Sequence, residues 1–372
     1  MRILITGSNG FIAKNLILRL SEIRDVEILE YNTASSENDL EKYIQSCDYI
    51  FHLAGVNRPE NDADFVNVNG GLTKRICEIA AKCDQKPSII FSSSTQAELD
   101  NEYGKSKVIA EKALQSYAEE NPAKTFIYRL PSVMGKWCRP DYNSVVATFC
   151  HNIANDKTIT INDSETVIEL VYIDDVVNEF IRIITENPTN DDDYMTVNPT
   201  YEVSLGKLAE YLYGFRDNRK DLFIDDVGSG FLRALYSTFI SYYPINEFSY
   251  DVPFSTDERG TFVEMLKTEN SGQMSFFTCH PGLTRGSHYH HTKTEKFLVV
   301  QGNAKFRFRN LLDDCIHEID TSSQQPEIVE SIPGWVHDIS NTGKDELIVM
   351  IWANEIFDQK NPDTVNAEVK NG

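Results

Sequence analysis

The chain has 372 residues, a length that favours two domains over a single core. Hydrophobic residues make up 41% and charged residues 25%, values typical of folded soluble proteins, which excludes the disordered and fibrous classes. Asp and Glu number 57 against 35 Lys and Arg, and the formal net charge of -22 repels polyphosphate. We therefore expect no nucleic-acid partner and no membrane partner.

The chain shows no sign of export or of disulfide stabilisation. The apolar run at the start is too short for a signal peptide, and no run approaches the ~20 apolar residues of a membrane span. The seven cysteines form no C-x-x-C pair, so we expect reduced thiols without assigned chemistry. These features predict a cytoplasmic protein.

Residues 1 to about 200 alternate short apolar runs with amphipathic stretches. The expected strands are Arg2 to Thr6, Val26 to Tyr31, Tyr49 to Leu53, Ser88 to Ser92 and Thr125 to Leu130. The expected helices between them include Phe11 to Leu20, Leu72 to Lys82 and Ser106 to Glu119. This βαβ pattern predicts an α/β Rossmann-type fold, a doubly wound parallel sheet with helices on both faces.

The pattern changes after Tyr243-Pro244 to short strand-like runs separated by Gly, Pro and Asn turns. These runs are Thr261 to Leu266, Gln273 to Thr278, Lys296 to Val300, Ala304 to Phe308 and Leu347 to Trp352. Few helical patterns occur there, which predicts a small all-β barrel or sandwich. We expect one domain over residues 1–245 and a second over residues 246–372.

A glycine-rich turn follows the first expected strand directly and opens the first expected helix. Gly7 permits a tight turn, Gly10 lets a pyrophosphate approach the backbone, and Ala13 lets the helix pack closely on the strand. A purely structural turn is the alternative. On the dinucleotide interpretation, the candidate cofactor contacts in this segment are Gly7, Asn9, Gly10, Phe11 and Ile12.

The spacing G-x-x-G-x-x-A resembles the extended short-chain dehydrogenase/reductase family, whose members usually act on nucleotide-diphosphate sugars. His52-Leu-Ala-Gly55, Asn67-Val-Asn-Gly70 and Arg129-Leu-Pro-Ser-Val-Met-Gly135 also match positions of that family. The resemblance implies that Ala54, Gly55 and Pro131 contact the cofactor as well.

Tyr103-Gly-Lys-Ser-Lys107 carries the expected reductive chemistry. A spacing of four puts Tyr103 and Lys107 on one helix face, where an ammonium would lower the pKa of the phenol toward neutrality. The family resemblance makes Tyr103 the acid/base and lets Lys107 bind the nicotinamide ribose; an incidental pair on a surface helix is the alternative. Ser94, with Ser93 close behind, is the expected hydroxyl that polarises the substrate carbonyl.

Local residues leave the choice of cofactor open. Glu30 stands near the place of an acid that binds a ribose 2′-hydroxyl and rejects a 2′-phosphate. Asn32 and the hydroxyl residues that follow it could instead cradle a phosphate. The resemblance favours NADPH.

Histidines in the last quarter of the chain have informative spacing. Gly282, His288, His290, Glu295 and Gly302 resemble the first motif of the cupin family. Gly334, His337 and Asn341 resemble the second. His288 and His290 would share one strand face, and with Glu295 and His337 they suit Zn²⁺ or another first-row divalent ion. A non-metal cupin, in which a histidine acts as a base, is the alternative.

A reductase of this type joined to a cupin resembles a family of bifunctional capsular-polysaccharide synthesis enzymes. The resemblance implies a UDP-linked 4-keto-6-deoxy-N-acetylhexosamine as substrate. It is epimerised at C3 in the cupin and then reduced at C4 with NADPH, toward UDP-N-acetyl-L-fucosamine. Reduction destroys the ketone that acidifies the neighbouring C–H, so epimerisation comes first. We also expect a homodimer.

Two other interpretations remain open at the level of sequence. In one, the chain is a single-activity 4-ketoreductase whose cupin only binds sugar or mediates dimerisation. In the other, it is a nucleotide-sensing regulator on the same fold, for which the retained Tyr103 and Lys107 are unexpected.

Overall fold

The computed structural model describes the chain except residues 57–64, 190–191, 249, 292, 312, 333, 361 and 370–372. The contacts divide it into two compact units: residues 1–212 with 233–244, and residues 213–232 with 245–372. We call them the N-terminal unit and the C-terminal unit. The domain boundary at residue 245 stays a prediction, and segment 213–232 joins the C-terminal unit although it lies inside the first expected domain.

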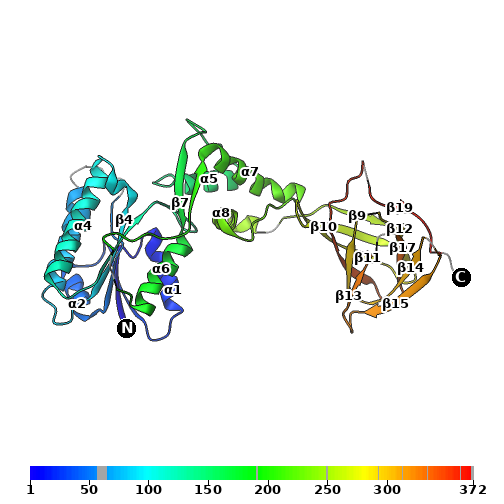
Figure 1. Cartoon of the computed structure of the whole chain (residues 1–372), viewed down its shortest axis with the longest axis horizontal. Helices are drawn as coiled ribbons and strands as arrows, with labels where there is room; N and C mark the ends of the chain where they lie inside the picture. The colour runs from blue at the N-terminus through cyan, green and yellow to red at the C-terminus, as the bar shows by residue number, and fades with distance from the viewer. Residues whose placement is uncertain are drawn as a thin grey trace. The chain divides into compact units, whose positions relative to one another are not determined.

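The N-terminal unit is built on a five-stranded parallel sheet with the order β2-β1-β3-β4-β5 (Figure 1). Its strands are β1 (Arg2–Thr6), β2 (Glu27–Tyr31), β3 (Tyr49–His52), β4 (Ser88–Ser94) and β5 (Thr125–Leu130). The Rossmann-type sheet predicted from the alternating pattern is confirmed. The direction in which successive strands are added reverses between β1 and β3, which makes this place the switch point of the sheet. Ligands of such sheets bind at the carboxyl ends of the strands at the switch point.

Helices cover both faces of this sheet because successive side chains of a strand point to opposite faces. Ile3 and Ile5 of β1 are buried in one apolar core with residues of α1 and α6. Leu4 is buried in a second core with residues of α2, α3 and α4. The helices are α1 (Phe11–Ser21), α2 (Glu37–Ser46), α3 (Leu72–Ala80), α4 (Glu102–Glu120), α5 (Val145–Ala154) and α6 (Ile173–Glu186).

Further elements lie within residues 65–247. A second sheet has the order β6-β7-β8, with β6 (Ser132–Met134), β7 (Val167–Tyr172) and β8 (Thr200–Ser204). The remaining helices are the π-helix η1 (Phe65–Gly71), the 3-10 helices η2 (Thr95–Glu98) and η3 (Ile245–Glu247), α7 (Leu205–Asp221) and α8 (Gly230–Ile240).

The C-terminal unit contains two antiparallel sheets with the orders β16-β13-β18-β11-β10-β9 and β15-β14-β17-β12-β19. Phe297 of β13 and Phe306 of β14 meet in its core, with ring centroids 5.5 Å apart. The all-β prediction is confirmed, but the described strands form two open sheets rather than the closed cupin barrel that we expected. The strands are β9 (Phe254–Asp257), β10 (Gly260–Thr268), β11 (Gly272–Cys279), β12 (Thr284–Tyr289), β13 (Glu295–Gln301), β14 (Asn303–Asn310), β15 (Ile316–Ser322), β16 (Ile328–Glu330), β17 (Trp335–Asn341), β18 (Leu347–Ala353) and β19 (Val365–Asn366).

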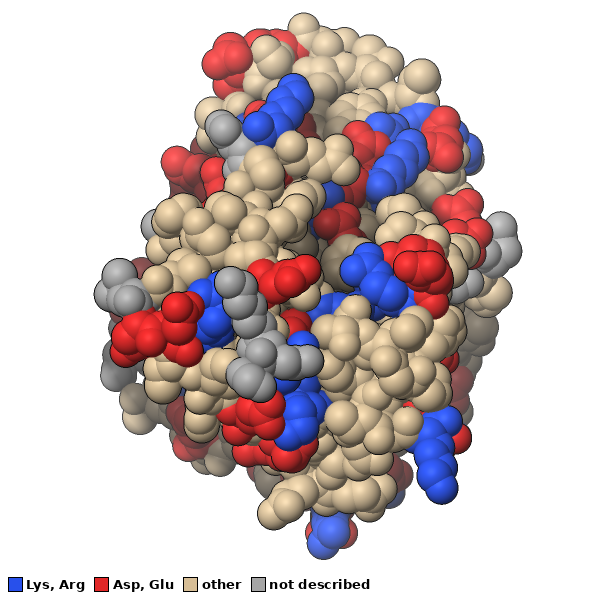
Figure 2. Space-filling view, turned by 90° about the vertical axis from the view of Figure 1, so that its right-hand side faces the viewer, with Lys and Arg blue, Asp and Glu red and all other residues tan. Residues whose placement is uncertain are grey.

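On the face shown in Figure 2, acidic and basic side chains are interspersed among uncharged ones. Among the described residues, no helix combines the length and the apolar character needed to span a membrane.

Candidate functional site

The glycine-rich turn lies between β1 and α1, at the switch point of the sheet. Gly7 has a φ of +68°, and a Cβ atom there would lie 2.7 Å from the Ala54 Cα atom. Glycine is therefore required both by the turn and by the close approach of Ala54, which follows β3. Gly10 precedes the first helical residue, Phe11, so this turn leads into the positive end of the α1 dipole.

Asn32 is the first residue after β2, and it borders the same turn. Its side-chain Nδ2 donates a hydrogen bond to Ser8 Oγ at 3.1 Å, and its Oδ1 accepts from the Ala34 backbone N–H at 3.0 Å. Glu30 lies within β2, in register with Ile5, and is exposed. An uncharged amide therefore contacts the turn at this strand end.

Tyr103 and Lys107 lie one helical turn apart near the beginning of α4. Asn101 caps this helix, because its Oδ1 accepts from the Gly104 backbone N–H at 2.8 Å. Lys107 is buried, and its Nζ donates to the Ser92 carbonyl at 2.8 Å. The same Nζ lies 5.7 Å from the centroid of the Tyr103 ring, so the helix brings the predicted pair together.

The expected effect of Lys107 on Tyr103 is wrong for this structure. Burial raises the pKa of Tyr103 to about 12, and the hydrogen bond with Ser94 only partly opposes this rise. Burial also lowers the pKa of Lys107 to about 8, although the nearby Glu111 carboxylate acts in the opposite direction. The Lys107 ammonium is directed at the Ser92 carbonyl. Desolvation of the Tyr103 phenol therefore affects the pKa of Tyr103 more than the attraction between this ammonium and a phenolate.

The two candidate serines have different partners. Ser94 ends β4 and interacts with the Tyr103 phenol. Ser93 is buried and donates its hydroxyl to Glu111 Oε1 at 2.5 Å. This arrangement supports Ser94 as the third member of the site, which stays a prediction.

The ends of β3 and β5 bring the remaining predicted contacts toward this site. Ala54 donates its N–H to Thr6 Oγ1 at 3.2 Å, and a Cβ atom on Gly55 would lie 3.5 Å from Lys107 Nζ. Pro131 directly follows Leu130, which pairs with Ser94 in the sheet. Candidate cofactor contacts from the turn, β3, β4, β5 and α4 therefore converge at the carboxyl ends of the strands.

Sequence analysis missed a buried polar link behind this site. His52 Nδ1 lies 2.7 Å from Thr6 Oγ1, and its Nε2 lies 2.8 Å from Thr73 Oγ1. Thr73 donates its hydroxyl proton to the Asn69 carbonyl, so Nε2 of His52 must carry its proton toward Thr73 and Nδ1 must accept from Thr6. A histidine between apolar strand residues was the available signal.

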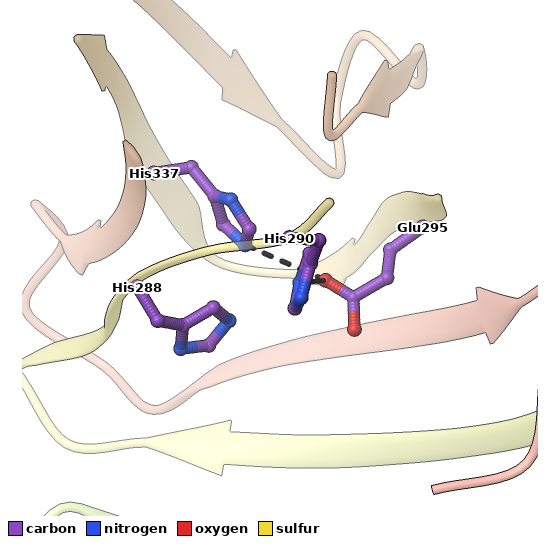
Figure 3. A group of neighbouring side chains, drawn as sticks. All are labelled: His288, His290, Glu295 and His337. Carbon is purple, nitrogen blue, oxygen red and sulfur yellow. Dashed lines mark hydrogen bonds and ion pairs between the residues drawn. The ribbon is translucent and has the colours of Figure 1, made fainter. Parts of the chain in front are cut away.

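The four predicted metal ligands in the C-terminal unit meet at one point (Figure 3). Their ligand atoms all lie within 4.8 Å of one another. His288 of β12 pairs with His337 of β17, while Glu295 begins β13. Glu295 Oε2 lies 3.1 Å from His290 Nε2 and 3.4 Å from His337 Nε2.

The chemistry of this cluster fits a divalent metal ion. His337 is buried, and within the described part of the chain neither of its ring nitrogens makes a hydrogen bond. Burial lowers the pKa of His288 to about 3, so its imidazole is neutral at pH 7. Burial opposes the charge of Glu295, but hydrogen bonding from His290 keeps the pKa of that carboxyl below its usual range. Neutral imidazoles and one carboxylate are ligands that Zn²⁺ accepts.

A cavity of about 300 Å³ adjoins the cluster. Phe262, Phe277 and Phe297 give it apolar walls, and the cationic side chains of Arg285 and Lys293 also line it. Lys293 Nζ lies 3.4 Å from Glu295 Oε1 and 3.3 Å from Thr364 Oγ1. The cavity combines apolar surface with polar groups that converge on the cluster, as small-molecule sites do.

The N-terminal fold and site define a class: enzymes of a Rossmann-type fold that use a nicotinamide nucleotide. Residues 3–198 match the NAD dependent epimerase/dehydratase family, and residues 255–365 match the polysaccharide biosynthesis C-terminal domain. The chain belongs to the family of nucleotide-sugar reductases and epimerases that combines these two parts, the family of CapF.

Full-length relatives support this assignment. The chain is 52% identical, over all of both chains, to the UDP-2-acetamido-2,6-beta-L-arabino-hexul-4-ose reductase of Pseudomonas aeruginosa. The crystal structure of the capsular polysaccharide assembling protein CapF from Staphylococcus aureus has a TM-score of 0.93 and 42% identity, covering 99% of this chain and 100% of that one. UDP-glucuronic acid 4-epimerase from Bacillus cereus, 18% identical with a TM-score of 0.52 over 57% of this chain and 83% of its own, shares only the fold.

Proposed function

We propose that the chain is a bifunctional enzyme acting on a UDP-2-acetamido-2,6-dideoxy-4-hexulose. Its cupin-like C-terminal unit epimerises the sugar at C3, and its N-terminal unit then reduces the C4 ketone with NADPH, toward UDP-N-acetyl-L-fucosamine. The observation that carries this proposal is the presence in one chain of two separate constellations, Tyr103 with Lys107 and the four-residue cluster around His337.

In the N-terminal unit, Tyr103 is suited to donate a proton to the ketone oxygen. Its pKa of about 12 keeps the phenol protonated at neutral pH, as a general acid requires before the reaction. Ser94 supplies a second hydroxyl at the same place, and bound NADPH supplies the hydride. Lys107 Nζ lies beside Gly55, at the end of β3, where it would bind the ribose of the cofactor.

In the C-terminal unit, His288, His290, Glu295 and His337 would hold Zn²⁺ or another first-row divalent ion. Such an ion acts as a Lewis acid toward the oxygen on which negative charge develops when a proton leaves the carbon beside a ketone. The cavity beside the cluster would place the sugar in a partly apolar space next to the ion. Epimerisation precedes reduction because it depends on the C4 ketone.

The relatives support the substrate class and the pathway. The Pseudomonas aeruginosa relative is named as a UDP-2-acetamido-2,6-beta-L-arabino-hexul-4-ose reductase, and the Staphylococcus aureus relative as a capsular polysaccharide assembling protein. We further propose, from the family resemblance, that the enzyme works as a cytoplasmic homodimer.

The test is to incubate the protein with a UDP-4-keto-6-deoxy-N-acetylhexosamine in D₂O, with and without NADPH. Without NADPH, mass spectrometry should show deuterium at C3 and no reduction. With NADPH, cofactor oxidation should accompany formation of the 4-hydroxy sugar. NADPH oxidation without any deuterium at C3 would contradict the bifunctional proposal and leave a single-activity 4-ketoreductase.

A further inference from the structure

Three consecutive residues at the end of β4 contact three successive turns of α4. Ser94 interacts with Tyr103, and the Ser92 carbonyl accepts from Lys107 at 2.8 Å. Ser93 donates to Glu111, which lies four residues beyond Lys107 on the same helix face. The strand that carries Ser94 is thereby fastened to the helix that carries Tyr103.

Glu111 is buried and has a partly buried cationic partner, Arg129, on β5. It is 1% exposed, and its two oxygens accept from Arg129 Nε at 3.0 Å and from an Arg129 terminal nitrogen at 2.7 Å. Arg129 lies in register with Ser93, and its guanidinium stacks on the Tyr194 ring with Cζ 3.6 Å from the centroid. The two-pronged contact and the stacking fix the carboxylate in one orientation.

We propose that the Glu111–Arg129 pair is a positioning device of the reductase site. Through Ser93 it holds the tip of β4 so that the Ser94 hydroxyl faces Tyr103, and its carboxylate keeps the Lys107 ammonium charged. This inference rests on the proposed reductase activity. Neither residue needs to touch the substrate or the cofactor to act in this way.

The charged and titratable groups around Lys107 agree with this role. His52 approaches from β3, while Tyr103 and Glu111 lie on its own helix, and the Ser92 carbonyl comes from β4. Burial lowers the pKa of Lys107 to about 8, and Glu111 is the anionic group that opposes this shift. His52 is neutral because burial lowers its pKa to about 3, so it cannot replace Glu111.

The first test is Glu111→Gln, which keeps the side-chain shape and removes the charge. We expect kcat for NADPH oxidation to fall about 10- to 100-fold, with the Kd for NADPH nearly unchanged. The pKa on the basic side of the kcat–pH profile should fall by about one unit. The pKa of Lys107, measured without cofactor from the ¹³C NMR shift of its ε-carbon, should fall by the same amount. The matched control is Glu98→Gln, because Glu98 binds the same Arg129 at 3.2 Å but is 68% exposed.

A second pair of variants keeps the test decisive if Glu111→Gln does not fold. Ser93→Ala retains both charges, so it should lower kcat severalfold without changing the pKa on the basic side of the kcat–pH profile, and Ser93→Thr should restore kcat. Unchanged kcat in Ser93→Ala, or an unchanged Lys107 titration in folded Glu111→Gln, would overturn the positioning role. Tyr103→Phe, assayed in parallel, tests the reductase activity itself, because full activity in that variant would reject the proposed function instead.

Discussion

His288 and His337 are direct partners across β12 and β17, and their ring centroids lie 4.7 Å apart. The antiparallel register puts both side chains on one face of the sheet. Burial and the neighbouring His337 keep the pKa of His288 near 3, so the ring is neutral and able to bind a metal at pH 7. Strand pairing therefore fixes two of the four candidate ligands, and loss of another ligand should leave them in place.

His290→Ala should separate the two proposed activities. His290 is buried and its Nδ1 lies 2.5 Å from the Asp363 carbonyl, which orients Nε2 toward Glu295. We expect metal affinity to fall at least about 100-fold and deuterium exchange at C3 to be lost, with a lower melting temperature for the C-terminal unit. The reductase should still oxidise NADPH with an already epimerised 4-keto sugar.

The measurements are metal content, deuterium at C3 and NADPH oxidation. His291→Ala is the matched control, because His291 is exposed and lies outside the cluster. Full exchange by His290→Ala with no bound metal would show that the metal role is wrong and would support a histidine acting as a base.

Tyr103→Phe should remove the proton donor of the reductase. The loss of one general acid should slow NADPH oxidation about 10²- to 10⁴-fold, while NADPH binding, measured by fluorescence titration, stays nearly unchanged. Tyr117→Phe on the same helix is the control for loss of a buried phenol. Reduction by Tyr103→Phe at the unaltered rate would reject the assignment.

The local sequence pattern was sufficient to predict most of the N-terminal fold. The strands Arg2–Thr6 and Thr125–Leu130 have the predicted limits, because apolar runs flanked by polar turns mark buried parallel strands. α4 begins at Glu102, four residues before the expected helix, because the Asn101 side chain caps it there. The four residues expected from the resemblance to the cupin motifs also lie together in the structure, and that they bind a metal stays a prediction.

Long-range packing explains what the sequence did not reveal. The spacing of Tyr103 and Lys107 predicted proximity correctly, but only the folded structure shows that the ammonium binds the Ser92 carbonyl and that burial raises the phenol pKa. Glu111 extends the same spacing by one turn, yet its partner, Arg129, comes from β5, which lies outside this helix. The division of the strands of the C-terminal unit into two sheets likewise depends on pairing between strands that are far apart in sequence.

Asn32→Asp should change the choice of cofactor. NADPH is expected to be preferred, and a carboxylate beside Ser8 at the end of β2 would repel the 2′-phosphate. We expect kcat/KM for NADPH to fall at least about tenfold, with a smaller change for NADH. Glu30→Gln is the control. Equal kcat/KM for the two cofactors in the unaltered enzyme would instead indicate that Glu30 binds the ribose hydroxyl.

The last prediction concerns the stability of the N-terminal unit at acid pH. His52 is buried between Thr6 and Thr73, and burial lowers its pKa from 6.5 to about 3. Between these two values the unfolded chain binds a proton that the folded chain does not. This histidine therefore contributes stability that is fully present above pH 6.5 and is lost as the pH falls toward 3, by about 1.4 kcal/mol per pH unit.

His52→Asn, which retains an acceptor near the Nδ1 position, removes this titration. The free energy of unfolding, measured in urea at pH 7 and pH 5, should be higher for the unaltered protein at pH 7 by about 1–3 kcal/mol. At pH 5 that difference should be about 2 kcal/mol smaller. The unaltered protein must lose the proton of His52 when it folds, whereas the variant has no such proton to lose. A His52→Asn difference that does not change with pH would mean that His52 binds its proton equally well in the folded and the unfolded chain, which contradicts a lowered pKa in the folded protein.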